Sequence, residues 1–195
     1  MSLEKAAILI DNMYVQHCAE LFQVGRLDPR KFPQMLLRPN EEHHMTYVFD
    51  ALPFVPRENP TEKQLELRRN KQTYFDALKY YERIAVELGY VRPKYTKCFN
   101  CKTDFYVPVQ KLVDVKISVR LVSLAWSDVV KKIILVSGDG DLIPAVEAAE
   151  PSAAIVRLAY VDEVGLNTSK VLIQNCPEKH KLTKEDFLKA VFEYK

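Results

Sequence analysis

The chain has 195 residues, of which 48% are hydrophobic and 28% are charged; this is the composition of an ordinary globular protein with one well-packed domain. Its 28 Lys and Arg nearly balance 26 Asp and Glu, so the formal charge of +2 excludes a partner selected by bulk charge alone. No apolar run is long enough for a signal peptide or a membrane span, and four irregularly spaced cysteines favour a reducing compartment. We therefore expect a cytoplasmic protein that makes no contact with a membrane.

Short apolar runs alternate with amphipathic segments along the chain. The runs predict buried strands over residues 6–10, 45–50, 133–136 and 153–160. Helical spacing is seen over residues 12–22, 61–88 (one helix or two), 110–126, the segment after 140, and 182–192, where Thr183 is the expected cap. This alternation predicts a three-layer α/β/α domain with a central parallel sheet.

Aspartates stand where the predicted strands end. Asp11 closes the first strand, Asp139 and Asp141 follow the third, and Asp114 falls near the first turn of the helix over 110–126; Asp50, after the second strand, is an outlier. The carboxyl ends of parallel strands form one edge of the sheet, where ligands bind. Carboxylate oxygens suit Mg²⁺ or Mn²⁺, and such ions can activate water and stabilise the charge building on a phosphodiester. The alternative for each Asp is a helix cap or a turn.

Other nucleotide and hydrolase signatures are missing. With 5 glycines, the chain has neither a G-x-x-x-x-G-K-[ST] loop nor a G-x-G-x-x-G loop, and Ser137-Gly138 lacks the G-x-S-x-G elbow of an esterase.

Cys98 and Cys101 form a C-x-x-C pair between two extended pieces, residues 89–97 and 102–108. The pair has the form of half a zinc site, but a closed structural site needs four ligands. Cys18 and Cys176 are distant in sequence, so the missing ligands would have to come from a second subunit or from an unforeseen contact. The alternative is a plain pair of thiols on a turn.

Basic and aromatic residues interleave over residues 90–120. Seven Lys and Arg face only two Asp in this segment, and five Tyr and Phe lie among them. Cations neutralise phosphates and aromatic rings stack on unpaired bases, so the segment is a candidate site for single-stranded nucleic acid. A basic surface over buried aromatic residues is the alternative.

Three segments together resemble the NYN-domain (LabA-like) proteins of the PIN-like nuclease superfamily. Residues 10–15 (IDNMYV) resemble the opening I-D-G-G-Y-L motif, and residues 109–120 (VQKLVDVKISVR) are similar to the V-Q-K-G-V-D-V-x-L-x-x-D helix. Residues 135–146 (LVSGDGDLIPAV) closely match the L-x-S-G-D-x-D-F-x-P-x-V signature. Residues 47–53 (YVFDALP) also look like a segment of one branch, Y-Y-D-A-L-P.

The resemblance implies a single PIN-like domain over residues 1–195, with a core of about 6–160 and a C-terminal helical extension of about 165–195. It also implies a Mg²⁺- or Mn²⁺-dependent ribonuclease acting on RNA. The matching catalytic positions are Asp11, Asp114, Asp139 and Asp141, and the first three would hold the metal. The predicted substrate-binding residues are Asn12, Lys111, Arg120 and Ser137, of which Lys111 and Ser137 match the family pattern.

Three positions depart from the family pattern. Asn12 and Leu112 stand where the family has Gly, and Arg120 stands where it has an Asp. Because Arg120 brings a positive charge, it would either face the substrate phosphates or weaken metal binding. Two functions therefore stay open: a metal-dependent endoribonuclease, or a weakened domain that binds RNA or protein without cutting. The apolar residues of 182–192 could pack on the domain itself or form a homodimer.

Overall fold

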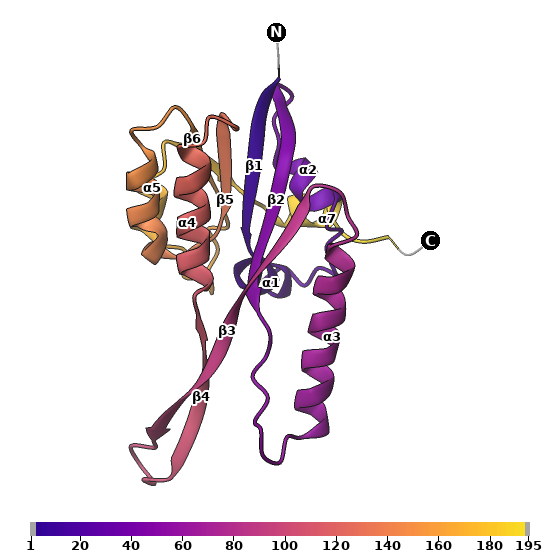
Figure 1. Cartoon of the computed structure of the whole chain (residues 1–195), viewed down its shortest axis with the longest axis vertical. Helices are drawn as coiled ribbons and strands as arrows, with labels where there is room; N and C mark the ends of the chain where they lie inside the picture. Colours follow the sequence, from indigo (N-terminus) through magenta and orange to yellow (C-terminus); the bar gives the residue numbers. More distant parts are fainter. Residues whose placement is uncertain (1–2, 194–195) are drawn as a thin grey trace.

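The computed structural model describes residues 3–193, which form one mixed sheet of seven strands covered by helices on both faces (Figure 1). The strands are Glu4–Asp11 (β1), Glu41–Ala51 (β2), Ile84–Lys97 (β3), Asp104–Lys111 (β4), Lys132–Val136 (β5), Ile155–Tyr160 (β6) and Glu178–Lys181 (β7). Their order is β4-β3-β2-β1-β5-β6-β7, and every neighbouring pair is parallel except β3 and β4. The predicted α/β class with a mostly parallel central sheet is confirmed.

Helices of the two faces bury separate cores. The helices are Asn12–Leu21 (α1), Lys31–Met35 (α2), Glu62–Leu78 (α3), Val113–Ala125 (α4), Ile143–Ala149 (α5), Lys170–Asn175 (α6) and Lys184–Lys189 (α7). Helices α4, α5 and α6 pack on one face with Tyr47 and Phe49 of β2. Helices α1, α2 and α7 cover the other face, and α3 packs beside them against Val48. The apolar period of each strand and helix therefore determines which layer it joins.

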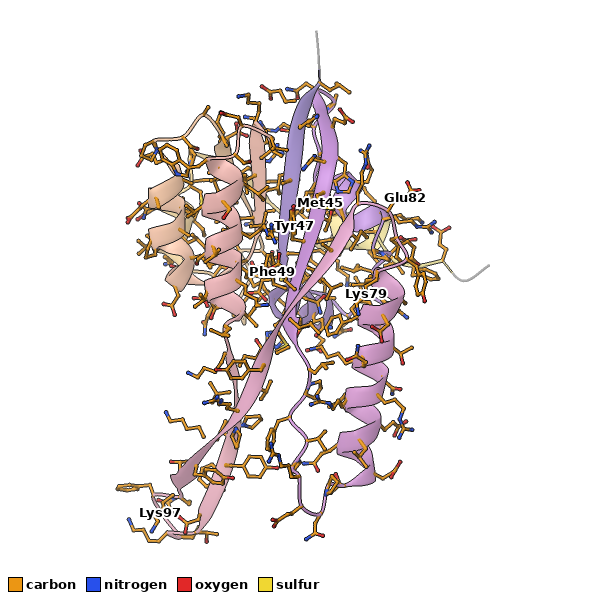
Figure 2. All side chains as sticks on the ribbon, viewed as in Figure 1. Met45, Tyr47, Phe49, Lys79, Glu82 and Lys97 are labelled. Atoms are coloured by element: carbon orange, nitrogen blue, oxygen red, sulfur yellow. The ribbon has the colours of Figure 1, made fainter. Side chains whose placement is uncertain are left out.

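Strands β3 and β4 extend beyond the rest of the sheet as a hairpin. Strand β3 pairs with β2 only as far as Gly89, and residues 90–97 then pair with residues 104–111 of β4. Figure 1 shows this hairpin reaching away from α4 and α5 in the direction in which α3 also extends, and Figure 2 places Lys97 at its far end. The hairpin leaves the sheet at the carboxyl edge of β2, the edge where the first parallel strands end.

Two of the predicted helices are wrong in part. The helix expected over 61–88 ends at Leu78, and Ile84–Leu88 belong to β3; the helix expected from residue 110 starts at Val113. Residues 84–88 alternate between the two faces of the sheet, which is the period of a strand. Helix α4 cannot start earlier because Gln110 and Lys111 pair with β3.

The C-terminal segment contributes to the sheet as well as to the helical layers. Thr183 caps α7 as predicted, with its hydroxyl accepting the N–H of Asp186. Strand β7 was not predicted, because its sequence EKHK has no apolar residue. It pairs with β6 at the sheet edge, and Phe187 of α7 is fully buried.

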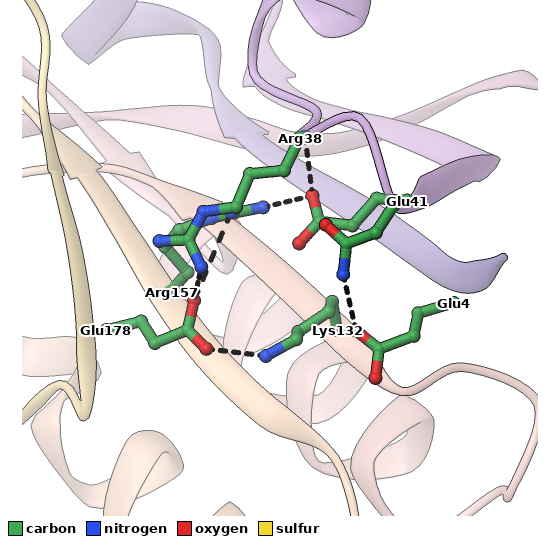
Figure 3. A network of polar contacts seen from close by, with 7 residues as sticks. Glu4, Arg38, Glu41, Lys132, Arg157 and Glu178 are labelled. Atoms are coloured by element: carbon green, nitrogen blue, oxygen red, sulfur yellow. Dashed lines mark hydrogen bonds and ion pairs between the residues drawn. The ribbon is translucent and has the colours of Figure 1, made fainter. Parts of the chain in front are cut away.

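A buried ion network joins the strands at the opposite, amino-terminal edge of the sheet (Figure 3). Arg157 of β6 is fully buried and lies 2.6 Å from the Glu41 carboxylate of β2. Glu178 of β7 pairs with Lys132 at 2.5 Å and with Arg38 at 2.8 Å. Burial alone would raise the pKa of Glu178, but these cations hold it below its usual value. The network ties β2, β5, β6 and β7 together in one register.

Across residues 3–193, no helix combines the length and the hydropathy that a membrane span requires.

Candidate active site

Asp11 lies at the carboxyl end of β1, where it also caps helix α1. Its Oδ1 accepts the backbone N–H of Tyr14 at 3.2 Å, and its Oδ2 accepts the hydroxyl of Ser137 at 3.2 Å. The β1–β5 pairing places Ile10 opposite Val136, so the two strands deliver Asp11 and Ser137 to the same edge. Asp11 can therefore cap α1 and also serve in an active site, because the capping hydrogen bond orients its carboxylate.

The segment Ser137–Asp141 turns sharply after β5. The buried Ser137 hydroxyl accepts the N–H of Asp139 at 3.2 Å, and Asp139 Oδ1 accepts the N–H of Asp141 at 2.9 Å. Asp139 thereby caps the single 3₁₀ turn Gly140–Leu142 that precedes α5. Ser137, predicted as a substrate-binding residue, hydrogen-bonds both strand ends and positions Asp11.

Four carboxylates that carry no counter-charge gather at this edge; we call them the acidic cluster (Asp11, Asp114, Asp139 and Asp141). Burial raises the pKa of Asp11 to about 6, and the charges of Asp114 and Asp50 add to the rise. Asp114 lies at the surface in the first turn of α4, where partial desolvation and the charges of Asp139 and Asp141 raise its pKa. Within residues 3–193 none of the four forms an ion pair, so each charge adds to the repulsion.

Asp50, the outlier of the sequence analysis, has the opposite environment. It is fully buried at the end of β2, and its Oδ1 accepts from Lys71 of α3 at 2.8 Å and from Gln110 at 3.3 Å. Its Oδ2 accepts the side-chain amide of Asn12 at 2.5 Å. Asp50 is therefore neutralised within the protein, and Asn12, predicted to bind substrate, holds it in place.

Gly138 and Gly140 allow a later segment to pack directly over this turn. A Cβ on Gly138 would lie 2.6 Å from the Tyr14 ring, and one on Gly140 would lie 3.0 Å from the Ser169 hydroxyl. The N–H of Ser169 donates to the Gly138 carbonyl at 2.9 Å, and the Tyr14 hydroxyl lies 3.0 Å from that of Thr168. A side chain at position 138 would therefore force Tyr14 to move, and one at position 140 would make a tight contact with Ser169.

An open hollow of about 640 Å³ borders the cluster on the α1 side. Asp11, Asp139 and the 165–169 segment line it together with one face of α1, formed by Met13, His17, Glu20 and Leu21. His17 belongs to none of the sequence motifs. The spacing of four residues from Met13 to His17 was the available signal, because it places both side chains on the same helix face.

Arg120 does not neutralise the acidic cluster. Its Nε donates to Glu87 of β3 at 2.8 Å, its Nη2 lies 2.6 Å from the same oxygen, and the guanidinium stacks 4.6 Å from the centre of the Tyr47 ring. The positive charge that Arg120 brings to this position is thus neutralised by Glu87 of β3. Lys111, the other predicted basic residue, is exposed at the end of β4, next to the first turn of α4.

Leu112 adopts the left-handed backbone that the glycine of the family pattern would adopt freely. Its φ of +69° makes it the residue that redirects the chain from β4 into α4. A side chain in this region costs about 1–2 kcal/mol, and Leu112 is 44% exposed, so little packing offsets the cost.

Leu112→Gly is therefore expected to raise the free energy of unfolding by about 1 kcal/mol in urea denaturation, after the greater flexibility of unfolded glycine is counted. Leu112→Ala is the control, because it removes the same packing but keeps the strained Cβ. Equal stability of the two variants would show that the backbone strain is not relieved.

Cys98 and Cys101 lie at the turn between β3 and β4, as predicted, whereas Cys18 and Cys176 are buried in opposite cores. Over residues 3–193, no three His, Cys, Asp or Glu side chains lie close enough to form a ready-made metal site. This holds for the cysteine pair and for the acidic cluster.

The fold and site together define an α/β protein with acidic residues gathered at the carboxyl edge of a mostly parallel sheet. A model of the NYN domain matches residues 5–183, and the chain therefore belongs to the NYN domain family. None of the curated proteins compared with it matches. The crystal structure of a protein of unknown function from Vibrio parahaemolyticus has a similar fold, with a TM-score of 0.60 at 23% identity over 95% of this chain and 96% of that one.

Proposed function

We propose that this protein is a metal-dependent ribonuclease of the LabA-like branch, which hydrolyses RNA phosphodiesters at the acidic cluster. The observation that carries the proposal is the contrast at one sheet edge between Asp50, which is paired with Lys71, and four carboxylates that are paired with no cation in residues 3–193. Like charges held together in this way call for a cation from outside the chain. The membership of the NYN family supports a nuclease.

The donor set fits Mg²⁺ or Mn²⁺ in kind, because it consists of carboxylate oxygens. Asp11, Asp114 and Asp139 would hold the ion, and Asp141 would assist directly or through water. Mg²⁺ usually keeps several waters and takes further oxygens from substrate phosphates, so it needs few ligands from the protein. When bound, a divalent ion at this edge supplies activated water and offsets the charge on the phosphodiester.

The residues of the chain orient this site. Ser137 donates to Asp11 Oδ2, which leaves Oδ1 facing the N–H of Tyr14 and fixes the plane of the carboxylate. Asp139 is held by two hydrogen bonds of its own turn. Such fixed carboxylates lose little freedom when a cation or substrate arrives, which is the purpose of preorganisation.

Single-stranded RNA is the substrate that the β3–β4 hairpin favours. Tyr90, Arg92 and Lys94 stand on β3 with Lys111 opposite Tyr90, and the Arg92 guanidinium lies 5.0 Å from the Tyr90 ring centre. Tyr90 is 39% exposed and Phe105 46% exposed, so the aromatic residues are not a buried layer under a basic surface. Exposed rings and cations that lead to the acidic cluster suit a strand with unpaired bases.

The test is cleavage of a labelled single-stranded RNA with Mg²⁺ or Mn²⁺. We expect cleavage that EDTA stops and that Asp139→Asn abolishes, because this substitution removes a charge but keeps the side-chain volume. Asp76→Asn on the exposed side of α3 is the matched control and should cut normally. Absence of cleavage over varied RNAs, with salt-dependent binding retained, would instead support a domain that binds RNA without cutting it.

Arg120→Asp would restore the acidic residue of the family pattern, but it cannot show whether the native site has lost activity. It would place a carboxylate beside Glu87, so instability is expected whether or not the site is active.

A further inference from the structure

The end of the β3–β4 hairpin is a turn that is closed by backbone hydrogen bonds and presents two thiols. The N–H of Cys98 donates to the Thr103 carbonyl at 2.9 Å, and the N–H of Lys102 donates to the Cys98 carbonyl at 3.0 Å. Lys102 takes a left-handed conformation that closes the loop. Cys98 and Cys101 stand three positions apart across this closed turn, which is the C-x-x-C spacing of two cysteines that bind one zinc ion.

Both thiols of this turn can be reached from solvent. Cys101 is exposed and Cys98 is half-buried, whereas Cys18 and Cys176 are core residues. The pair therefore has the access of a metal ligand set rather than that of structural thiols.

A single copy cannot complete a four-ligand site at this turn. Cys18 and Cys176 are buried on opposite faces of the sheet, and no third His, Cys, Asp or Glu joins the pair within residues 3–193. Structural zinc is tetrahedral and closed, and four cysteines are one of its standard sets. Two copies related by a two-fold axis would supply two cysteines each.

We propose that Zn²⁺ joins two copies of this chain at their hairpin ends, with Cys98 and Cys101 of each copy completing a four-cysteine site. Four Zn–S bonds form, and the thiol protons are released to solvent. Nothing is oxidised or reduced. The site is separate from the acidic cluster, and the proposal does not depend on ribonuclease activity.

The surroundings of the pair fit this occupant. Phe99 is 87% exposed and Tyr95 is 77% exposed, so each hairpin end carries apolar surface that a second copy would cover. Lys102 lies 4.8 Å from the Phe99 ring centre, and Lys97 is only loosely paired with Asp104 at 3.8 Å. Lys97, Lys102 and Asp104 together give each hairpin end one net positive charge. Two ends therefore balance the two negative charges of a zinc ion bound by four thiolates. The hairpin end lies well away from α4 and α5, so two ends can meet (Figure 1).

The test is sedimentation of the whole chain under a thiol-free reductant, with and without one equivalent of ZnCl₂ per two chains. We expect the mass to double with zinc, one bound zinc per two chains, and a return to the single-copy mass with EDTA. Co²⁺ in place of zinc should give the absorption bands of a tetrahedral four-thiolate site.

Cys98→Ser and Cys101→Ser should each abolish the zinc-dependent doubling without changing the thermal unfolding of the single copy. Asp139→Asn should dimerise as the wild type does, so a failure of the ribonuclease proposal leaves this result unchanged. One zinc per chain without dimerisation would overturn the proposal. So would a dimer that forms without zinc, or one that survives the cysteine substitutions.

Discussion

Replacing Asp11 by Asn is expected to abolish RNA cleavage and at the same time to stabilise the fold. Loss of an outer-shell partner of a metal ligand already costs roughly 10- to 100-fold in activity, so loss of a ligand should cost about 100-fold or more. Asn keeps one oxygen that can accept the N–H of Tyr14, and Asn is also a good helix cap, so α1 should start as before.

The gain in stability follows from the raised pKa of Asp11. The value of about 6 in the fold exceeds the ordinary value of 3.8, so the folded state binds the proton more tightly than the unfolded state does. The stability of the wild type therefore falls as the pH rises between these two values, and the full penalty is present at neutral pH. Removing the charge should raise the free energy of unfolding by on the order of 2 kcal/mol.

Cleavage rates and urea unfolding of the two proteins check both effects, with EDTA in the unfolding experiments so that bound metal does not stabilise the wild type. The difference in stability should shrink as the pH falls from about 6 through 3.8, and it should vanish below 3.8, where Asp11 is protonated in both states. RNA cleavage by the variant at the wild-type rate would show that Asp11 is not part of the active site. A variant less stable than the wild type at neutral pH would show that Asp11 carries its charge without cost.

Arg157→Met is expected to lower the free energy of unfolding by about 3–5 kcal/mol, the largest stability effect that we predict. The side chain of Arg157 is 1% exposed and that of Glu41 is 0% exposed, so the variant leaves a buried carboxylate without its cation. One oxygen of Glu41 already lacks a hydrogen-bond partner, as do Nε and Nη1 of Arg157. The Arg157–Glu41 pair thus lacks some of its hydrogen bonds. Replacing both residues by apolar ones should therefore destabilise the fold less than replacing Arg157 alone.

The double variant Arg157→Met with Glu41→Leu should therefore regain most of the stability that the single variant loses, as measured by urea unfolding at pH 7. Lys181→Met is the control, because it breaks the exposed Lys181–Asp162 pair and should change little. If the double variant is no more stable than Arg157→Met, the loss would come from packing around position 157 rather than from the unpaired carboxylate.

The local pattern of apolar residues was enough to predict most strands of the sheet. It did not predict the strands whose formation depends on pairing with a neighbouring strand. The apolar runs of β1, β5 and β6 could be assigned because strands buried on both faces are rich in aliphatic residues, and the one buried charge among them, Arg157 of β6, did not hide the pattern. Residues 84–88 fit a helix and a strand equally well by composition, and only pairing with β2 resolves them. Strand β7 carries no hydrophobic signal, since its sequence is EKHK and Glu178 joins the ion network at the sheet edge.

The sequence by itself determined the α/β class, the NYN motifs and the placement of acids after strands, because each follows from a short stretch of chain. Only the tertiary structure decided which acids lack a counter-charge, since the partners come from distant elements. Lys71, far from Asp50 in sequence, neutralises it, and Glu87 takes the charge of Arg120. The cluster of Asp11, Asp114, Asp139 and Asp141 is what remains without a cation at that edge.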